Sequence, residues 1–261
     1  MSRLGLAAVL VVVGSFLSAD PPALSAGTPT CAGLAVTIDL ADTDAPDPDR
    51  AASDVVLGTP GDDRIRTGAG DDVVCAGGGG DTIYLGAGDD KGLGGPGIDR
   101  LVFSEGDDVM IGGAGRDWID YVDAHHGLSV DLGSNVRQDT GVGHDIVRTI
   151  ENASGASHFA NQVTGDCGPN FLVGGDEADY FHGLCGRDII EAWRGNDRVW
   201  GGYGDDFVRG GYGADRLAGQ QGDDELLGAN GGDLLRGGPG TDVCDGGKGV
   251  DDRRACESGT R

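Results

Sequence analysis

The chain has 261 residues, 52 of them glycine, and its 44 acidic and 19 basic residues give a formal net charge of −25. Aromatic residues make up only 5% of it, so the burial of apolar surface is a weak source of stability for this chain. The charge argues against nucleic-acid binding, which needs clustered Lys and Arg, and it favours cationic partners, of which metal ions are the simplest.

Residues 1–26 have the layout of a secretory signal peptide. Met1-Ser2-Arg3 is a short positive start, an apolar run extends from Leu4 to Leu17, and small residues follow up to Ala26. The run is too short for a transmembrane segment, and no other stretch is long enough to span a bilayer. We therefore expect cleavage near Ala26, with Ala19 as the alternative, and a secreted mature chain.

Residues 27–57 are less regular than the rest of the mature chain. They include an acidic, proline-containing stretch from Asp39 to Arg50, "DLADTDAPDPDR". Such a composition is typical of a linker. We predict an N-terminal cap followed by an acidic linker.

A nine-residue repeat begins at Gly58 and continues without a gap to Asp120. The fourth residue of each of its seven rows is glycine, and the eighth is apolar in every row but one, which has Gly92. The sixth residue is always aspartate: Asp63, Asp72, Asp81, Asp90, Asp99, Asp108 and Asp117. A register held over so many rows is the signature of a repeat architecture.

Residues 121–164 interrupt the repeat. "GLSVDL" (127–132) alternates as a strand does, and Asn161 and Val163 are in phase with the rows that follow, which indicates one damaged additional row. The remainder is compatible with long non-binding coils or with a small β-rich insert. Asp123, His125, His126, His144 and Asp145 lie close together in the sequence, but neither H-E-x-x-H nor G-x-S-x-G occurs. We assign no catalytic residue.

A second series of ten rows runs from Gly165 to Arg254. Its first row has Asn170 at the sixth position, and its last row has Arg253 in place of the apolar eighth residue. The sixth residues of the eight rows between them are Asp179, Asp188, Asp197, Asp206, Asp215, Asp224, Asp233 and Asp242. Residues 255–261 are left as a C-terminal cap.

The alternation of side chains along a strand gives the aspartates a direction. Positions six and eight share one face of a strand, and positions seven and nine share the other. The eighth position is apolar and marks the interior, whereas the seventh and ninth hold Arg64, Arg66, Arg100, Arg198, Arg209, Arg216 and Arg236. The sixth-position carboxylates therefore point inward, where they must be neutralised or coordinated. Carboxylate oxygens, together with the carbonyls of glycine-rich turns, favour Ca²⁺.

Rows such as "GGPGIDRLV" (94–102) and "GGYGDDFVR" (201–209) resemble the nonapeptide of RTX-type, or haemolysin-type, calcium-binding repeats. The resemblance implies an all-β fold, a parallel β-roll (a right-handed β-solenoid) in which each row supplies a turn and a short strand and two rows complete one coil. Residues 143–165 resemble the degenerate segments that connect RTX blocks. The fold is then two blocks, 58–120 and 165–254, around a β-rich insert.

With two rows to a coil, each row stacks on the row two places later, and an ion is expected between the two. The fifteen aspartates at sixth positions, Asp63 to Asp117 and Asp179 to Asp242, are the predicted ligands. At most about thirteen Ca²⁺ ions fit this stacking at the spacing of adjacent strands, and their charge would roughly balance that of the chain.

Six cysteines in a secreted chain suggest three disulfides. Cys167 and Cys185 occupy the same position in rows two places apart and are expected to pair. Cys244 and Cys256 lie together at the C-terminal end, which leaves Cys31 with Cys75. The two terminal bonds would fasten the caps that a solenoid needs.

These features predict a secreted calcium-binding protein that folds when it meets extracellular Ca²⁺ and that has a structural or interaction role rather than an enzymatic one. No segment is left that is long enough for a hydrolase core. Two alternatives remain. One is a calcium-dependent adhesin or matrix component with a cell-surface partner, and the other is a small exported enzyme with its site in 121–164.

Overall fold

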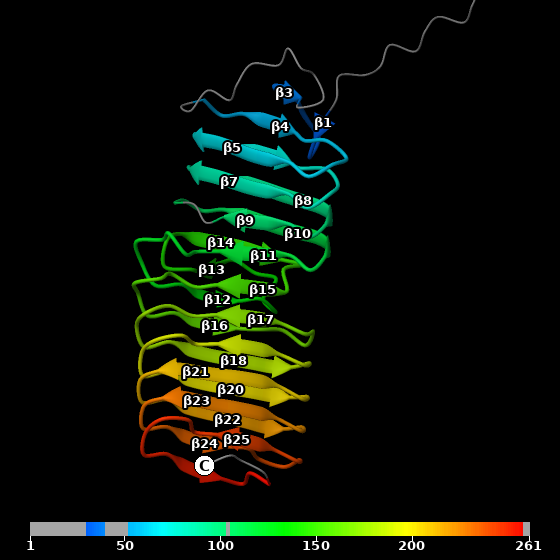
Figure 1. Cartoon of the computed structure of the whole chain (residues 1–261). Helices are drawn as coiled ribbons and strands as arrows, with labels where there is room; N and C mark the ends of the chain where they lie inside the picture. Colours follow the sequence, from blue (N-terminus) through cyan, green and yellow to red (C-terminus); the bar gives the residue numbers. More distant parts are fainter. Residues whose placement is uncertain (1–29, 40–51, 103–104, 258–261) are drawn as a thin grey trace, which may run out of the picture.

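The computed structural model describes residues 30–39, 52–102 and 105–257, and over these residues it contains strands and turns but no helix. The strands stack in two facing layers along the length of the molecule (Figure 1). The predicted signal peptide and residues 40–50 of the predicted linker lie outside the described residues. Because the described part has no helix, it also has none that could cross a membrane.

One layer, the ten-stranded layer, is a single parallel sheet. It passes through the connecting segment without a break, because β15 pairs with β11 on one side and with β17 on the other. In spatial order its strands are β5 (Arg64–Ala69), β7 (Thr82–Ala87), β9 (Arg100–Val102), β11 (Trp118–Asp120), β15 (Asn152–Ser154), β17 (Phe171–Val173), β19 (Ile189–Glu191), β21 (Phe207–Tyr212), β23 (Glu225–Asn230) and β25 (Val243–Asp245).

The opposite layer, the divided layer, consists of two seven-stranded sheets. The first contains β3 (Ile38–Asp39), β4 (Val55–Leu57), β6 (Val73–Cys75), β8 (Lys91–Gly97), β10 (Val109–Gly115), β14 (His144–Arg148) and, antiparallel to β14, β13 (Gln138–Asp139). The second contains β12 (Ser129–Asp131), β16 (Gln162–Thr164), β18 (Tyr180–Cys185), β20 (Arg198–Tyr203), β22 (Arg216–Gln221), β24 (Leu234–Arg236) and β26 (Asp252–Arg254). A short hairpin, β1 (Thr30–Cys31) and β2 (Leu34–Ala35), lies at the N-terminal end.

Each row stacks on the row two places later, as the sequence predicts. In the ten-stranded layer Val208 is the Cα partner of Leu226, and in the divided layer Val199 is the partner of Leu217. Successive rows therefore contribute to opposite layers, and two rows make one coil. The all-β parallel β-roll predicted from the sequence is confirmed.

The core is a column of eighth-position side chains between the two layers. Ile83, Leu101, Leu172 and Val208 are among those with no exposed surface. The glycine at this position in one row is compensated within the same row. A Cβ atom on Gly92 would lie 3.2 Å from Cδ1 of Leu85, which begins that row and is fully buried. The side chain of Leu85, at the first position of the row, therefore takes the place of the apolar side chain that the eighth position lacks.

The roll extends beyond the two predicted blocks. In front of the first block, β4 pairs with β6 and places Val56 opposite Val74. Between the blocks, β14 and β15 continue the first sheet of the divided layer and the ten-stranded layer, respectively. The damaged row predicted from Asn161 and Val163 is confirmed, because Val163 is the Cα partner of Phe181.

Three disulfides are present, and their pairing is the one predicted: Cys31–Cys75, Cys167–Cys185 and Cys244–Cys256. The first joins the N-terminal hairpin to β6, and the last joins β25 to the residues after β26. The second joins two stacked turns one coil apart. Two of the bonds therefore fasten the ends of the roll, where coils have no neighbour on one side.

Candidate metal centre

The sixth-position aspartates lie at the end of each turn, one residue before the strand begins. Their side chains point into the molecule on the same face as the apolar eighth position. Asp206, for example, is 3% exposed, and Val208 is fully buried. We call this column the inner ladder. Of the fifteen predicted ligands, Asp63 is half-buried, and the other fourteen, Asp72, Asp81, Asp90, Asp99, Asp108, Asp117, Asp179, Asp188, Asp197, Asp206, Asp215, Asp224, Asp233 and Asp242, are buried.

Hydrogen bonds connect the inner ladder from coil to coil in one direction. The backbone N–H of Asp206 donates to Oδ1 of Asp224, one coil later, with an N–O distance of 2.9 Å. The same bond recurs along both blocks, for example from Asp72 to Asp90 at 2.7 Å. One oxygen of such a carboxylate is thereby held against the neighbouring coil. The second oxygen accepts a backbone N–H of its own turn at Asp63 and at Asp179, but not in most rows.

That second oxygen is the unusual feature of the ladder. A buried carboxylate oxygen is normally hydrogen-bonded, but among the described residues no hydrogen-bond partner is found for the buried Oδ2 atoms of thirteen aspartates. These are Asp54, Asp72, Asp81, Asp90, Asp99, Asp117, Asp188, Asp197, Asp206, Asp215, Asp224, Asp233 and Asp242. Each is a buried acceptor that calls for a cation or a proton.

Burial changes the acidity of these carboxyl groups. It raises the pKa of Asp197 to about 8, and the like charges of Asp215 and Asp179 add to the effect, although the hydrogen bond from the Asp179 amide opposes it. Burial likewise raises the pKa of Asp188 and of Asp90 to about 7. Without a cation, burial therefore favours the protonated form of these carboxyl groups, and their ionised form calls for a positive charge nearby.

Backbone carbonyls come close to the same oxygens. A Cβ atom on Gly201, the first residue of its row, would lie 2.3 Å from Oδ2 of Asp206 and 2.9 Å from the carbonyl oxygen of Gly219. Within the described residues no three His, Cys, Asp or Glu side chains converge as a metal site would require. An ion at this edge would therefore depend on carbonyl oxygens as well as carboxylates, which is the ligand set that suits Ca²⁺.

The glycines of the turn have two different roles. At the second and fourth positions the backbone is left-handed, as at Gly202 (φ 128°) and Gly204 (φ 125°), a conformation that glycine adopts most readily. At the first position the glycine has another role, because Gly201 is not among the residues with positive φ. It is required there by close approach, because a side chain would collide with Asp206.

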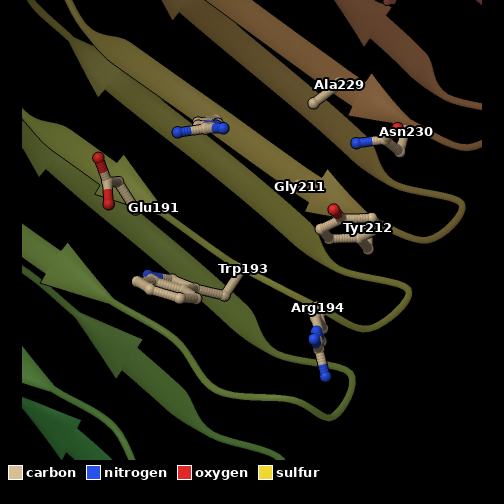
Figure 2. A pocket seen from close by; sticks show the side chains of 8 residues that line it. Glu191, Trp193, Arg194, Gly211, Tyr212, Ala229 and Asn230 are labelled. Carbon is tan, nitrogen blue, oxygen red and sulfur yellow. The ribbon is translucent and has the colours of Figure 1, made fainter. Parts of the chain in front are cut away.

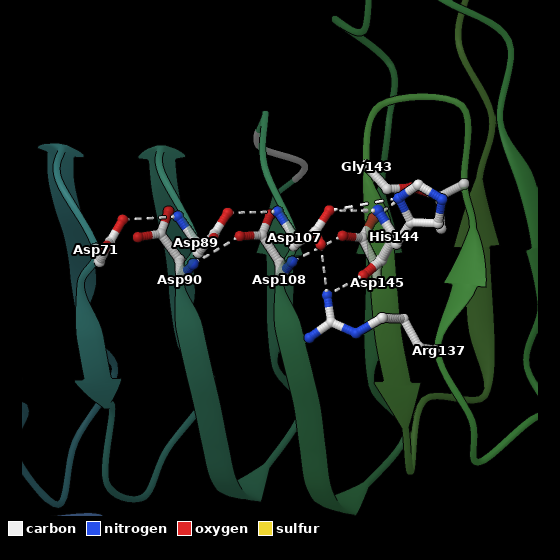
Figure 3. Close-up of polar contacts among 10 residues, drawn as sticks. Asp71, Asp89, Asp90, Asp107, Asp108, Arg137, Gly143, His144 and Asp145 are labelled. Atoms are coloured by element: carbon white, nitrogen blue, oxygen red, sulfur yellow. Dashed lines mark hydrogen bonds and ion pairs between the residues drawn. The ribbon is translucent and has the colours of Figure 1, made fainter.

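A second column of side chains, the outer ladder, occupies the fifth position. Asp205 is exposed, as expected, yet its Oδ1 accepts a hydrogen bond from the backbone N–H of Asp223 at 3.0 Å. Here the donor lies in the later coil, which is the reverse of the inner ladder. Strand parity places the fifth position on the outer face together with the seventh, but it does not reveal this hydrogen bond. The two ladders run side by side in the first block (Figure 3).

Three acidic residues that the sequence did not assign continue the inner ladder. Asp54 donates its N–H to Oδ1 of Asp72, Asp145 accepts from the N–H of Asp108 at 2.8 Å, and Glu151 accepts from the N–H of Asp117. Asp54 is detectable because it is followed two residues later by buried Val56. Asp145 and Glu151 are out of phase with the repeat, and only the short pattern of "DIV" (145–147) resembles a row.

The cluster considered for an enzymatic site is not assembled. Asp145 is buried, where it also accepts a hydrogen bond from the Thr140 hydroxyl. His144 is exposed, with Nδ1 3.5 Å from Oδ1 of Asp107 (Figure 3). Asp123, His125 and His126 are exposed as well. Neighbours in the sequence thus point to opposite faces of β14 or lie on the surface.

A family model described as the RTX calcium-binding nonapeptide repeat matches the chain at residues 51–83, 76–101, 93–121, 164–199, 200–235 and 219–252. These matches cover more than half of the chain. They include the whole first block and the second block up to residue 252, and at their N-terminal limit they reach the row that contains Asp54. A comparison with curated proteins found no match.

Proposed function

The chain belongs to the family of RTX calcium-binding nonapeptide repeat proteins, and we propose that it is a secreted β-roll that completes its folding when extracellular Ca²⁺ binds along the inner ladder. The observation that carries this proposal is the set of buried Oδ2 atoms without a hydrogen-bond partner among the described residues. Metal binding would satisfy them and would supply folding free energy that a glycine-rich chain otherwise lacks.

The proposed ligands are the fifteen predicted aspartates of the inner ladder, together with turn carbonyls such as that of Gly219. At most about thirteen ions would be held if each lies between rows two places apart, at the spacing of neighbouring strands. Asp54 is a further candidate, since its Oδ2 is buried in the same way. When bound, calcium supplies positive charge; the chain supplies the fixed oxygens and excludes water from them.

Secretion is supported by two independent features. The predicted signal peptide covers residues 1–26, and the six cysteines form three disulfides. Disulfides persist in oxidising compartments and are rare in the cytosol. Millimolar extracellular calcium would then drive folding after export, because extracellular calcium modules bind with dissociation constants of about 10⁻⁴ to 10⁻³ M.

A second candidate function, a calcium-dependent adhesin or matrix component, is favoured by aromatic side chains on the surface. The side chains of Trp193, Tyr203 and Tyr212 are each more than half exposed, although only 5% of the residues of the chain are aromatic. Exposed apolar side chains that lie together often mark binding sites, and Trp193 and Tyr212 line the same hollow. The role we propose is therefore structural or interactive rather than catalytic.

A calcium titration of the full chain tests the proposal. Far-ultraviolet circular dichroism in EGTA should show less β-structure than in CaCl₂, and added CaCl₂ should restore the difference with a midpoint of about 10⁻⁴ to 10⁻³ M. MgCl₂ at the same concentrations is the control, because Mg²⁺ prefers octahedral sites and keeps its water. An identical spectrum in EGTA and in CaCl₂ would contradict calcium-dependent folding.

A further inference from the structure

The outer surface of the second block contains a hollow of about 280 Å³ beside β19, β21 and β23. Figure 2 shows its lining. Glu191 is the last residue of β19, and Trp193 lies in the turn that follows it. Arg209 and Tyr212 belong to β21, and Asn230 is the last residue of β23. It lies outside the inner ladder and on the far side of the sheet from the buried core.

The hollow exists because stacked turns differ in side-chain size. Trp193 occupies the second position of its row, and the same position in the next two coils is filled by Gly211 and Ala229. The indole therefore stands beside two coils that offer almost no side chain. Trp193 is 57% exposed and Tyr212 is 61% exposed, so both present an aromatic surface to whatever enters.

Trp193 is held in an unfavourable backbone conformation. Its φ is 72°, in the left-handed region, which a bulky residue rarely occupies. Glycine at this position, as in Gly202 and Gly211, avoids the strain. Strained residues of this kind persist where the surroundings hold them and cluster at functional sites. An exposed, strained tryptophan adds nothing to the core, so we expect its ring to contact a ligand at the surface.

Polar groups capable of directed hydrogen bonds surround the ring. Glu191 and Arg209 are Cα partners in adjacent strands. Among the described residues, their side chains and that of Asn230 take part in no recorded hydrogen bond or ion pair. Arg194 lies over the Tyr212 ring, with its Cζ 5.8 Å from the centroid. A carboxylate, a guanidinium and an amide are planar groups that can form paired hydrogen bonds.

We propose that this hollow binds one pyranose unit of a glycan, with Trp193 as the stacking surface. A pyranose has an apolar C–H face that fits an aromatic ring and vicinal hydroxyl groups that fit planar carboxylate, amide and guanidinium partners. The volume is close to the lower end of ligand pockets, about 300 Å³, and suits a single ring. A membrane is disfavoured as occupant because the acidic chain would be repelled by anionic lipids.

This proposal rests on the proposed function in one respect: the coils that form the hollow must be folded before a sugar can bind. The test uses the full chain saturated with CaCl₂ and checked by circular dichroism. Binding is measured by saturation-transfer NMR and calorimetry against glucose, galactose, mannose, N-acetylglucosamine and glucuronic acid. The central variant is Trp193→Gly, which removes the ring and also relieves the backbone strain. It should fold at the same or a lower calcium concentration.

The matched control is Gln220→Gly. Gln220 also occupies a second position with positive φ (83°), but it is not among the residues that line the hollow. At least one sugar should bind the wild-type chain. Trp193→Gly should weaken that binding at least about tenfold, which corresponds to about 1.4 kcal/mol, whereas Gln220→Gly should leave it unchanged. Glu191→Gln should also weaken it, and Glu225→Gln, on the same sheet, should not.

Two results would overturn the proposal: no sugar of the panel binds the folded chain, or Trp193→Gly binds as tightly as wild type. Neither result depends on how folding is driven. If circular dichroism is the same in EGTA and in CaCl₂, calcium-dependent folding fails while a Trp193-dependent sugar signal would still support the site. The two ideas therefore fail separately.

Discussion

The inner ladder changes its chemistry where the connecting segment meets the second block. At Asp206 one carboxylate oxygen is buried and has no hydrogen-bond partner among the described residues. At Asn161, the equivalent position of the damaged row, the amide nitrogen donates to the carbonyls of Ala156 and Phe159 and to Oδ1 of Asp179. Its oxygen accepts from the N–H groups of Leu128 and Ala156.

Asn170 repeats this arrangement in the next row. Its amide nitrogen donates to the carbonyl of Glu151 and to Oδ1 of Asp166. The amide thus closes the turn from within, whereas the carboxylate of a regular row leaves an oxygen for an external cation. The comparison teaches that a single atom at the sixth position, nitrogen or oxygen, separates a turn closed by its own hydrogen bonds from one that leaves a buried oxygen without a partner among the described residues.

Removal of calcium should destabilise the regular rows much more than the rows of Asn161 and Asn170, and this is the largest effect we expect. In EGTA, backbone amides of β21 and β23 should lose protection from hydrogen exchange, because their turns hold unneutralised carboxylates. Amides of β16 and β17 should keep more protection, since Asn161 and Asn170 close the turns that precede these strands and the Cys167–Cys185 disulfide ties the adjacent coil. Hydrogen exchange followed by mass spectrometry measures this. Equal loss throughout the roll would show that the joint is metal-dependent too.

Asn161→Asp should convert the self-sufficient turn into a dependent one. The substitution removes three donated hydrogen bonds and places a charge beside Asp179. A buried group left unsatisfied costs about 1–3 kcal/mol, so the thermal midpoint in EGTA should fall, and calcium should restore part of the loss. Asn135→Asp is a suitable control, because Asn135 lies in the same segment but is exposed to solvent and belongs neither to a ladder nor to the core. A midpoint unchanged in EGTA would refute the role of the amide.

Asp206→Ala tests the opposite side of the comparison. Loss of one proposed carboxylate ligand should raise the calcium midpoint of folding about tenfold, equivalent to about 1.4 kcal/mol. Asp224→Ala should do the same, and the double variant should cost less than the sum because the two residues are coupled. Asp205→Ala is the matched control. It removes a hydrogen bond to Asp223 in the outer ladder but no buried oxygen, so its effect should be clearly smaller. Equal effects of Asp205→Ala and Asp206→Ala would mean that the register is wrong.

The dependence of stability on pH should be a smaller effect than those of the substitutions above. Its sign should be opposite in the presence and in the absence of calcium. Burial raises the pKa of Asp206 and Asp224 to about 6 and that of Asp188 to about 7. In the metal-free fold, this raised pKa contributes stability below about pH 4 that is lost as the pH rises through 6 to 8. Calcium must displace the protons, so its midpoint should rise as the pH falls from 8 to 5.

Proton release on calcium binding, measured in weakly buffered solution, checks the pH dependence directly. The release should be greatest near pH 6 to 7, where the buried carboxyl groups titrate. Asparagine does not titrate, so the turns closed by Asn161 and Asn170 contribute no protons. Binding without proton release at that pH would contradict raised pKa values in the inner ladder.

The sequence predicts the regular rows well because the repeat has strict alternation. Asp206 and Val208 are two residues apart and point to the same side, which parity alone establishes. The row that contains Asp54 was not predicted because the glycines of the repeat are absent there: Asp49, Arg50 and Ala52 occupy the first, second and fourth positions. Only the sixth and eighth residues keep the pattern.

Other features depend on contacts between coils, which a periodic pattern does not reveal. Leu85 replaces the missing core side chain of Gly92 from the opposite end of the same row. Asp145 stacks on Asp108 across a separation of 37 residues instead of a multiple of nine. The Asp205 hydrogen bond to the next coil requires knowledge of which backbone N–H the stacking leaves beside it. In each case the partner is distant in the sequence, and its identity follows from the three-dimensional register.

The unequal continuity of the two layers has a mechanical consequence. Hydrogen bonds between coils run along the long axis of the roll, so a pull on its two ends loads them one coil after another rather than all at once. Along most of the length both layers share that load. At the connecting segment, no strand pairing among the described residues joins the two sheets of the divided layer. Hydrogen bonds from Ser129 to Thr140 and between Asp131 and Gln138 link them instead, so most of the load falls on the pairing of β11 with β15 and of β15 with β17. Under tension from a surface to which either end is attached, the roll should part first at this joint, with each calcium-loaded block still wound.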